Sequence, residues 1–215
     1  MPERQLNIQL NGYWHSGSGQ SGGTYLDAVM EKDAGELPFV AGRQLKGLLR
    51  DALRRAAAWG WPLGQVLAGP AATLEELLFG SATQSLQRDH TLPGMMFFSD
   101  AVLCADEQHW LQHNPQLTSH LYQPLYSTAI NDKGSAQAGS LRGIEVCVPL
   151  TLHAHLNLAI TTAQVAHREQ QASWLARADR WHWLPQCLPL IDAVGAHRSR
   201  GFGEAVLSLQ PSQED

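Results

Sequence analysis

An alternation of apolar and polar residues after Ile144 constrains the fold of this chain more than any other feature. The apolar positions of this run are Val146, Val148, Leu150, Leu152, Ala154, Leu156, Leu158 and Ile160. The polar positions between them include Glu145, Thr151, His153, His155 and Asn157. Successive side chains of a β-strand point to opposite faces of its sheet. The alternation therefore predicts one long strand with a buried face and a polar face.

Shorter patterns of the same kind predict three more strands. Leu6, Ile8 and Leu10 alternate with polar residues near the N-terminus. An apolar run over residues 95–103 predicts a second strand, and residues 205–209 predict the last one. The protein should therefore contain a sheet with one covered face.

Helical periodicity predicts two helices, over residues 43–58 and roughly 163–178. The order strand, helix, strand, strand, helix, strand is that of a ferredoxin-like (RRM-like) βαββαβ domain, which belongs to the α+β class. Residues near 59–94 and 105–143 then form insertions into one domain that spans 1–215.

Composition limits the classes of function. The chain has 215 residues, 44% of them hydrophobic, which suits one domain with a sizeable core. Its net charge of −5 and pI near 6.0 exclude proteins that coat nucleic acid through overall positive charge, so any RNA contact must be local. No apolar run is long enough to span a membrane, and we expect a soluble cytoplasmic protein without a membrane partner.

Cys104, Cys147 and Cys187 are widely spaced and lack a CxxC pair, so neither a disulfide framework nor a zinc site follows.

A periodic row of cations begins just after a turn at residues 37–42. Arg43, Lys46, Arg50 and Arg54 recur at helical spacing, and leucines and alanines form an apolar stripe on another side. One face of this helix can enter a core while the cationic face binds a phosphate backbone. The alternative is an ordinary amphipathic helix whose charged face meets only water.

A second cationic element, a glycine-rich loop over residues 195–203, lies near the C-terminus. It contains His197, Arg198, Arg200, Gly201 and Phe202. Glycine allows a backbone to approach a ligand closely, arginine binds phosphate, and phenylalanine offers a face for base stacking. The alternative is a plain turn before the last strand.

Together these elements resemble the repeat-associated mysterious protein (RAMP) superfamily of CRISPR effector subunits. Residues 38–47 are similar to its proline–glycine and Leu-Lys-Gly signature, and residues 195–203 are similar to its C-terminal glycine-rich loop. Further similar segments are residues 78–80, 98–103 and 141–146. The chain departs from the family at Ala41, where a second proline is usual, and at Arg43-Gln44, where a small serine-containing pair is usual.

The resemblance implies a backbone subunit of a type III CRISPR effector complex that cleaves target RNA. Its partners would be guide (CRISPR) RNA, target single-stranded RNA, other effector subunits and copies of itself. Arg43, Lys46, Arg50 and the 195–203 loop would bind the guide, and a polar segment over residues 125–142 would form a protrusion that wedges the duplex.

The same resemblance makes Asp27 the catalytic candidate. An aspartate at the corresponding loop position is required for target cleavage in such subunits, whereas Asp33 is similar to a following acidic residue with a structural role. Asp27 would accept the 2′-proton or hold a divalent cation, with Mg²⁺ the expected ion and no tightly bound cofactor. The sequence leaves the choice between base and metal ligand open.

Two alternatives remain open, and two other kinds of site are disfavoured. His15 or His197 could serve as the acid or base of a CRISPR-RNA-processing endonuclease from the same superfamily. Asp27 could instead be structural, in a non-catalytic RNA-binding scaffold. The glycine- and serine-rich segment over residues 16–23 lacks the lysine of a nucleotide phosphate loop, so nucleotide binding is disfavoured, and His109 and His113 lack a third zinc ligand.

Overall fold

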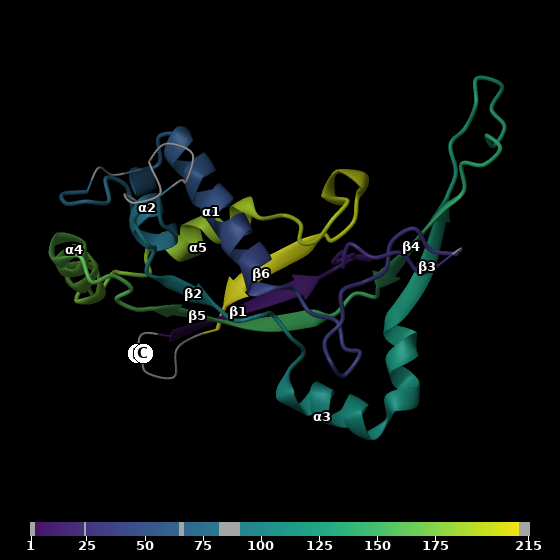
Figure 1. Cartoon of the computed structure of the whole chain (residues 1–215), viewed down its shortest axis with the longest axis horizontal. Coiled ribbons are helices and arrows are strands. Elements are labelled where there is room, and N and C mark those ends of the chain that lie inside the picture. Colours follow the sequence, from purple (N-terminus) through teal and green to yellow (C-terminus); the bar gives the residue numbers. More distant parts are fainter. Residues whose placement is uncertain (1–2, 24, 65–66, 82–90, 211–215) are drawn as a thin grey trace.

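The computed structural model describes residues 3–23, 25–64, 67–81 and 91–210. Its centre is a four-stranded sheet, shown edge-on in Figure 1. The strands are β1 (Glu3–Leu10), β2 (Met96–Phe98), β5 (Thr151–Leu158) and β6 (Ala205–Leu209), in the order β2-β5-β1-β6. Every neighbouring pair is antiparallel. The α+β class predicted from the sequence is therefore confirmed.

Alternation of side chains gives this sheet two different faces. Leu6 and Ile8 of β1 and Leu152 of β5 are fully buried and belong to the core. On the opposite face, Nδ1 of His153 lies 2.8 Å from Oδ1 of Asn7 and 3.2 Å from Nε2 of Gln5. Polar side chains on this face thus satisfy one another across adjacent strands.

The helices that cover the apolar face are α1 (Gly42–Ala58), α2 (Leu74–Phe79) and α5 (Trp183–Cys187), which lie above the sheet in Figure 1. Helix α4 (Val165–Leu175) lies at one end of the sheet, and α3 (Ala105–His113) lies on the other side. Short 3₁₀ segments complete the described elements: Pro62–Gly64, Pro115–Leu121, Leu188–Leu190 and Arg198–Arg200. No helix in the described part of the chain has the length and apolar character needed to cross a membrane.

The second sheet is a protruding hairpin of β3 (Tyr122–Ser127) and β4 (Arg142–Cys147), drawn at the upper right of Figure 1. A parallel bridge between Ala28 and Ile144 joins the segment that follows residue 26 to its base. An antiparallel bridge between Trp14 and Cys147 attaches the other side. The hairpin is thus anchored at its base, while residues 129–139 are exposed.

The prediction of one long strand after Ile144 is wrong. The structure ends β4 at Cys147 and starts β5 at Thr151, because β4 pairs with β3 whereas β5 pairs with β1 and β2. Pro149 lies in the gap and has no backbone N–H to donate to a ladder. Alternation of side chains continues through this corner, so the sequence pattern does not reveal it.

Candidate nucleic-acid interface

The cationic face of helix α1 points away from the core because the opposite, apolar face of the helix is buried. Apart from Gly42, Gly47 and Asp51, its residues favour helices, and Leu45, Leu49 and Leu53 are each about 1% exposed. Its first N–H, from Gly42, donates to Oδ1 of Asp100 at 2.7 Å. A Cβ on Gly42 would lie 2.7 Å from the carbonyl oxygen of Phe98, so glycine is required for this close packing. The start of α1 is therefore fixed against β2.

Two predicted contact residues lie in the first turns of α1. The Arg43 side chain is 78% exposed and pairs with Glu31 at 3.1 Å. Lys46 is half-buried and, among the described residues, takes part in no ion pair. Its ammonium charge remains available to a ligand, whereas the charge of Arg43 is partly compensated.

Arg50 differs from the expectation that it is free to bind RNA. Its Nε donates to Glu75 at 2.7 Å, and its NH2 group donates to the carbonyl oxygen of Gly80 at 3.0 Å. Arg54 donates to the same carboxylate with two nitrogens. Burial alone would raise the pKa of Glu75, but the hydrogen bonds from Arg54 and Arg50 outweigh it and lower that pKa. Arg50 therefore joins α1 to α2 within the protein.

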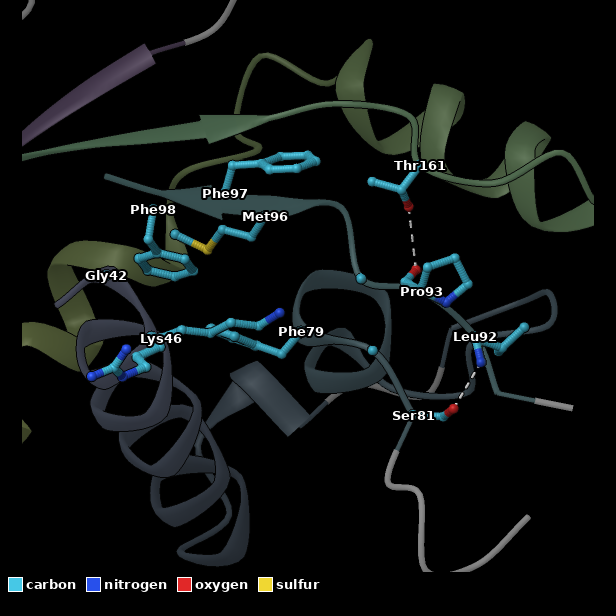
Figure 2. Close-up of a pocket in the computed structure, with 13 residues that line it drawn as sticks. Gly42, Lys46, Phe79, Ser81, Leu92, Pro93, Met96, Phe97, Phe98 and Thr161 are labelled. Atoms are coloured by element: carbon cyan, nitrogen blue, oxygen red, sulfur yellow. Dashed lines mark hydrogen bonds between the residues drawn. The ribbon is translucent and has the colours of Figure 1, made fainter. Parts of the chain in front are cut away.

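A cavity of about 600 Å³ opens beside Lys46. Its lining residues are Gly42, Arg43, Lys46, Phe79, Gly80, Ser81, Leu92, Pro93, Gly94, Met96, Phe97, Phe98 and Thr161. Figure 2 shows the Lys46 side chain extending from α1 toward the segment that carries Pro93, with Met96 and Phe98 of β2 on one side. The cavity combines cations with aromatic faces, a combination that suits nucleotides.

The aromatic residues that line this cavity were not among the predicted site residues. Phe97 is 51% exposed, on the edge strand β2. Phe79 and Phe98 stack with ring centroids 6.2 Å apart. Phe79 and Phe98 lie in segments 78–80 and 98–103, which resemble the RAMP superfamily, and Phe97 lies in the run that predicts a strand.

The C-terminal loop is held in place by backbone bonds to the segment that follows β1. The N–H of Ala196 donates to the carbonyl of His15 at 2.7 Å, and the N–H of Gly203 donates to that of Tyr13 at 2.8 Å. Gly195 has φ 96°, and a Cβ there would lie 2.6 Å from the carbonyl oxygen of His15. Glycine is therefore required at this junction by both backbone conformation and space.

The loop presents Arg198 and Arg200 to solvent as a 3₁₀ turn. Both residues are exposed, and neither takes part in an ion pair with a described residue. Gly201, at φ 83°, ends the turn, and the half-buried ring of Phe202 lies edge-on to His197 at 6.2 Å. The predicted residues of this loop thus form one local cationic surface.

The two candidate histidines lie together, with ring centroids 5.8 Å apart. His15 is only 2% exposed, and its Nδ1 donates to the carbonyl oxygen of Glu145 at 2.6 Å. His197 is half-buried with φ 58°, and its pKa is lowered by burial and, to a smaller extent, by His15 and Arg200. Direct contact with RNA is therefore open to His197 and closed to His15.

Asp27 lies at the base of the protruding hairpin and is exposed. Its N–H donates to the carbonyl of Gly143 at 2.7 Å, and its Oδ2 accepts from the N–H of Gly143 at 2.8 Å. The side chain of Glu145 fixes the following residues, since it accepts from the N–H of Met30 and from Nζ of Lys32, each at 3.0 Å. Asp33 closes a turn through the N–H groups of Gly35 and Leu37. The Asp27 carboxylate is thus oriented by the hairpin while staying accessible.

The predicted site residues form three groups. Helix α1 and the C-terminal loop rise from the same side of the central sheet in Figure 1, but the loop does not line the cavity beside Lys46. Asp27 belongs to the third group, at the hairpin. The cavity beside Lys46, the C-terminal loop and Asp27 are thus three separate places on the molecule.

Comparisons with known proteins support the fold. No curated protein matches the chain. One chain from "Cryo-EM structure of the Type III-B Cmr-beta bound to cognate target RNA" superposes with a TM-score of 0.62 at 10% identity, covering 97% of both chains. A chain of the apo Type III-B Cmr-beta structure gives 0.57 at 12% identity, covering 96% of both. A chain of a Type IV-B CRISPR complex gives 0.57 at 14% identity, covering 99% of this chain and 92% of that one.

A model of the RAMP superfamily matches residues 7–206, which is nearly the whole chain. The signatures noted at residues 38–47 and 195–203 lie inside this match. The chain belongs to the RAMP superfamily.

Proposed function

We propose that this chain is a backbone subunit of a type III-like CRISPR ribonucleoprotein that binds guide RNA and, through Asp27, cleaves bound target RNA. Membership of the RAMP superfamily and the likeness to CRISPR complex chains support the assignment. The order β2-β5-β1-β6 in an antiparallel sheet also supports a ferredoxin-like domain, in which β3, β4 and α3 are inserted between the second and third strands of the central sheet.

The observation that carries the proposal is the placement of uncompensated cations on one side of an acidic protein. Lys46, Arg198 and Arg200 have no ion-pair partner among the described residues, although the chain carries a net charge of −5. Acidic proteins bind nucleic acid only where local positive charge is concentrated. Lys46 on α1 and the two arginines on the C-terminal loop would contact successive parts of the guide backbone.

The protruding hairpin supports a role for Asp27 near a distorted RNA strand. The exposed tip of the hairpin contributes no residue to the hydrophobic core. At the base of the hairpin, Asp27 is hydrogen-bonded to Gly143. A hairpin that separates adjacent nucleotides would leave the strand unstacked beside this carboxylate. Unstacking allows the 2′-oxygen, the phosphorus and the 5′-oxygen to approach an in-line arrangement.

The chemistry then requires little from the protein. The Asp27 carboxylate accepts the proton of the 2′-hydroxyl, and the 2′-oxygen forms a bond to phosphorus. The bond from phosphorus to the 5′-oxygen breaks, and the leaving oxygen takes a proton from water. The products are a 2′,3′-cyclic phosphate and a 5′-hydroxyl. Asp27 thus acts as a base whose orientation is fixed by Gly143.

The donor set at Asp27 fits a divalent cation only together with substrate oxygens. No group of three or more histidine, cysteine, aspartate or glutamate side chains suited to a metal ion occurs among the described residues. Mg²⁺ is commonly held by one or two carboxylates plus phosphate oxygens and water, so Asp27 with a bound RNA phosphate satisfies that pattern. A bound Mg²⁺ would neutralise charge that develops on the phosphate.

Replacing Asp27 with alanine in the assembled complex tests the proposal. We expect normal guide content, normal target binding and loss of target cleavage, measured by gel analysis of end-labelled target RNA. Asp33→Ala is a matched acidic control with a turn-closing role, which should lower stability without selective loss of cleavage. Unchanged cleavage by the assembled Asp27→Ala complex would refute the catalytic role.

The hydrogen bond between Asp27 and Gly143 also favours a second candidate, a non-catalytic RNA-binding scaffold in which Asp27 only fixes the hairpin. Asp27→Asn distinguishes the two, since its amide oxygen can still accept from Gly143 but is a very weak base. A scaffold predicts that neither wild-type nor variant complexes cleave target. A guide-processing enzyme would instead cleave repeat RNA as an isolated chain, through His197.

A further inference from the structure

Helix α3 carries two histidines that lie side by side in its second half. His109 and His113 are four residues apart, a spacing that puts two side chains on one face of a helix. Their ring centroids are 4.3 Å apart, and the ring planes are tilted by 50°. Both residues are exposed. The ring contact of His15 with His197 is wider, at 5.8 Å, and His15 is buried. The pair on α3 is therefore the more open of the two to a ligand from solvent.

The hydrogen bonds of this pair leave ring nitrogens available to a metal ion. Nδ1 of His113 lies 2.8 Å from the carbonyl oxygen of His109 and donates its proton to that oxygen. In a neutral ring the lone pair is then on Nε2. Histidines that bind metals commonly donate the other ring N–H to a carbonyl in this way, because the bond fixes the tautomer and the direction of the ring. Neither ring nitrogen of His109 forms a hydrogen bond with a described residue.

The charge around the pair favours a cation. Helix α3 contains no lysine or arginine, and its first turn carries Asp106 and Glu107. Asp106 is exposed and precedes His109 by three residues, so it lies on the same face of the helix. The helix ends at His113, which places the negative end of the helix dipole beside the pair. A cation held by the two rings is therefore stabilised by charge from both directions along this face.

We propose that His109 and His113 together bind a divalent transition metal ion, with Cu²⁺ bound more tightly than Zn²⁺. Imidazole nitrogens suit these ions, whereas Mg²⁺ takes oxygen ligands. Among the described residues no third histidine, cysteine or carboxylate joins the pair. The lack of a third ligand excludes a closed structural zinc site and leaves an open one, in which water completes the coordination.

This site is separate from the proposed RNA-binding function. Helix α3 lies on the opposite side of the central sheet from α1 (Figure 1). The ligands at the site are nitrogens, whereas the Asp27 carboxylate would hold Mg²⁺ through oxygen. The inference therefore does not depend on the activity assigned to Asp27.

Calorimetric titration of untagged protein with CuCl₂ and with ZnCl₂ at neutral pH tests the site. We expect one tightly bound Cu²⁺ per chain and weaker binding of Zn²⁺, and the electron paramagnetic resonance spectrum of the Cu²⁺ should show two nitrogen ligands. His109→Ala or His113→Ala should weaken Cu²⁺ binding about tenfold or more, because each removes one ligand. Alanine favours helices, so α3 should persist in both variants. Binding should also be lost in acid, since a protonated imidazole cannot bind a metal ion.

His182→Ala is the matched control. His182 is exposed, and its Nδ1 also donates to a backbone carbonyl, that of Asp179 at 2.7 Å, but the ring beside it is that of Trp174 and not a second histidine. This variant should bind Cu²⁺ like wild type. Wild-type affinity in the double variant of His109 and His113 would overturn the inference. An equal loss of affinity in His182→Ala would also overturn it, since it would show that exposed histidines bind the ion singly.

Discussion

At the scale of single residues, Glu75 pairs two of the cations of α1 within the protein. It accepts hydrogen bonds from both Arg50 and Arg54, and its own side chain is only 21% exposed. The pair of arginines therefore holds α2 against α1, whereas Lys46, in the first turns of the helix, takes part in no ion pair with a described residue.

Replacing Glu75 with glutamine should destabilise the protein by about 1–2 kcal/mol at neutral pH, because the partly buried Arg50 and the more exposed Arg54 lose a charged acceptor. The pKa of Glu75 is lowered in the folded state, so its contribution is present above the ordinary pKa of 4.5 and is lost as pH falls through the folded value. Urea unfolding of wild type and Glu75→Gln, at neutral pH and below pH 4.5, measures the free energy of unfolding of each protein. The curves of wild type and variant should converge in acid.

The exposed pair of Asp179 and Arg177 provides the control for that prediction. Its atoms lie 2.7 Å apart, but both side chains are about half exposed. Asp179→Asn should therefore change stability much less than Glu75→Gln, since exposed ion pairs contribute little. Equal effects of the two substitutions would contradict the structural role of Glu75.

The same residues show what the sequence could and could not predict about the site. Helical spacing places Arg43, Lys46 and Arg50 on one face, and this face exists in the structure. Spacing within one helix carries no information about Glu75, which comes from another element 25 positions later. The pairing of Arg50 was therefore beyond a pattern analysis.

At the scale of elements, the hairpin shows a similar limit. Alternation correctly placed β-structure on both sides of Pro149, but it did not show that the chain leaves one sheet and enters another. Strand alternation reports the two faces of a strand and not its hydrogen-bonding partners. Helix α1 was predicted within one residue because its periodicity is strong, whereas the short helix α2 depends on its Thr73 cap and the turn at Gly80.

Shortening the hairpin tests its proposed role as a wedge. Residues 130–139 are exposed and contribute no buried apolar residue, so replacing them with an Asn-Gly turn should change the melting temperature little. We expect the assembled complex to bind target RNA but to cleave it at least about tenfold more slowly, because the strand beside Asp27 is no longer held in an in-line arrangement. Rates from single-turnover cleavage measure this. Wild-type rates in a folded shortened variant would remove the wedge from the mechanism.

At the scale of the whole molecule, the net charge of the chain opposes the proposed binding of RNA. A net charge of −5 repels RNA at long range, and cations on α1 and the C-terminal loop attract it at short range. Binding should therefore depend steeply on salt and on the number of phosphates contacted. The slope of log affinity against log salt concentration therefore gives the number of phosphate contacts without a structure of the complex.

Replacing Arg198 and Arg200 together with alanine should make this slope shallower. Each contact with a phosphate of a single strand contributes about 0.7 to the slope of log affinity against log salt, so losing two contacts should reduce it by roughly 1.4. Arg168→Ala with Arg177→Ala is the control of equal charge change, since both arginines are exposed on or near the end of α4, and Arg177 pairs with Asp179. Fluorescence anisotropy over a range of salt concentrations measures all three proteins. The control should keep the wild-type slope, because repulsion by net charge is spread over the surface whereas counterion release is local to the contacts. Equal slopes for wild type and the Arg198/Arg200 variant would show that the C-terminal loop does not touch the RNA backbone.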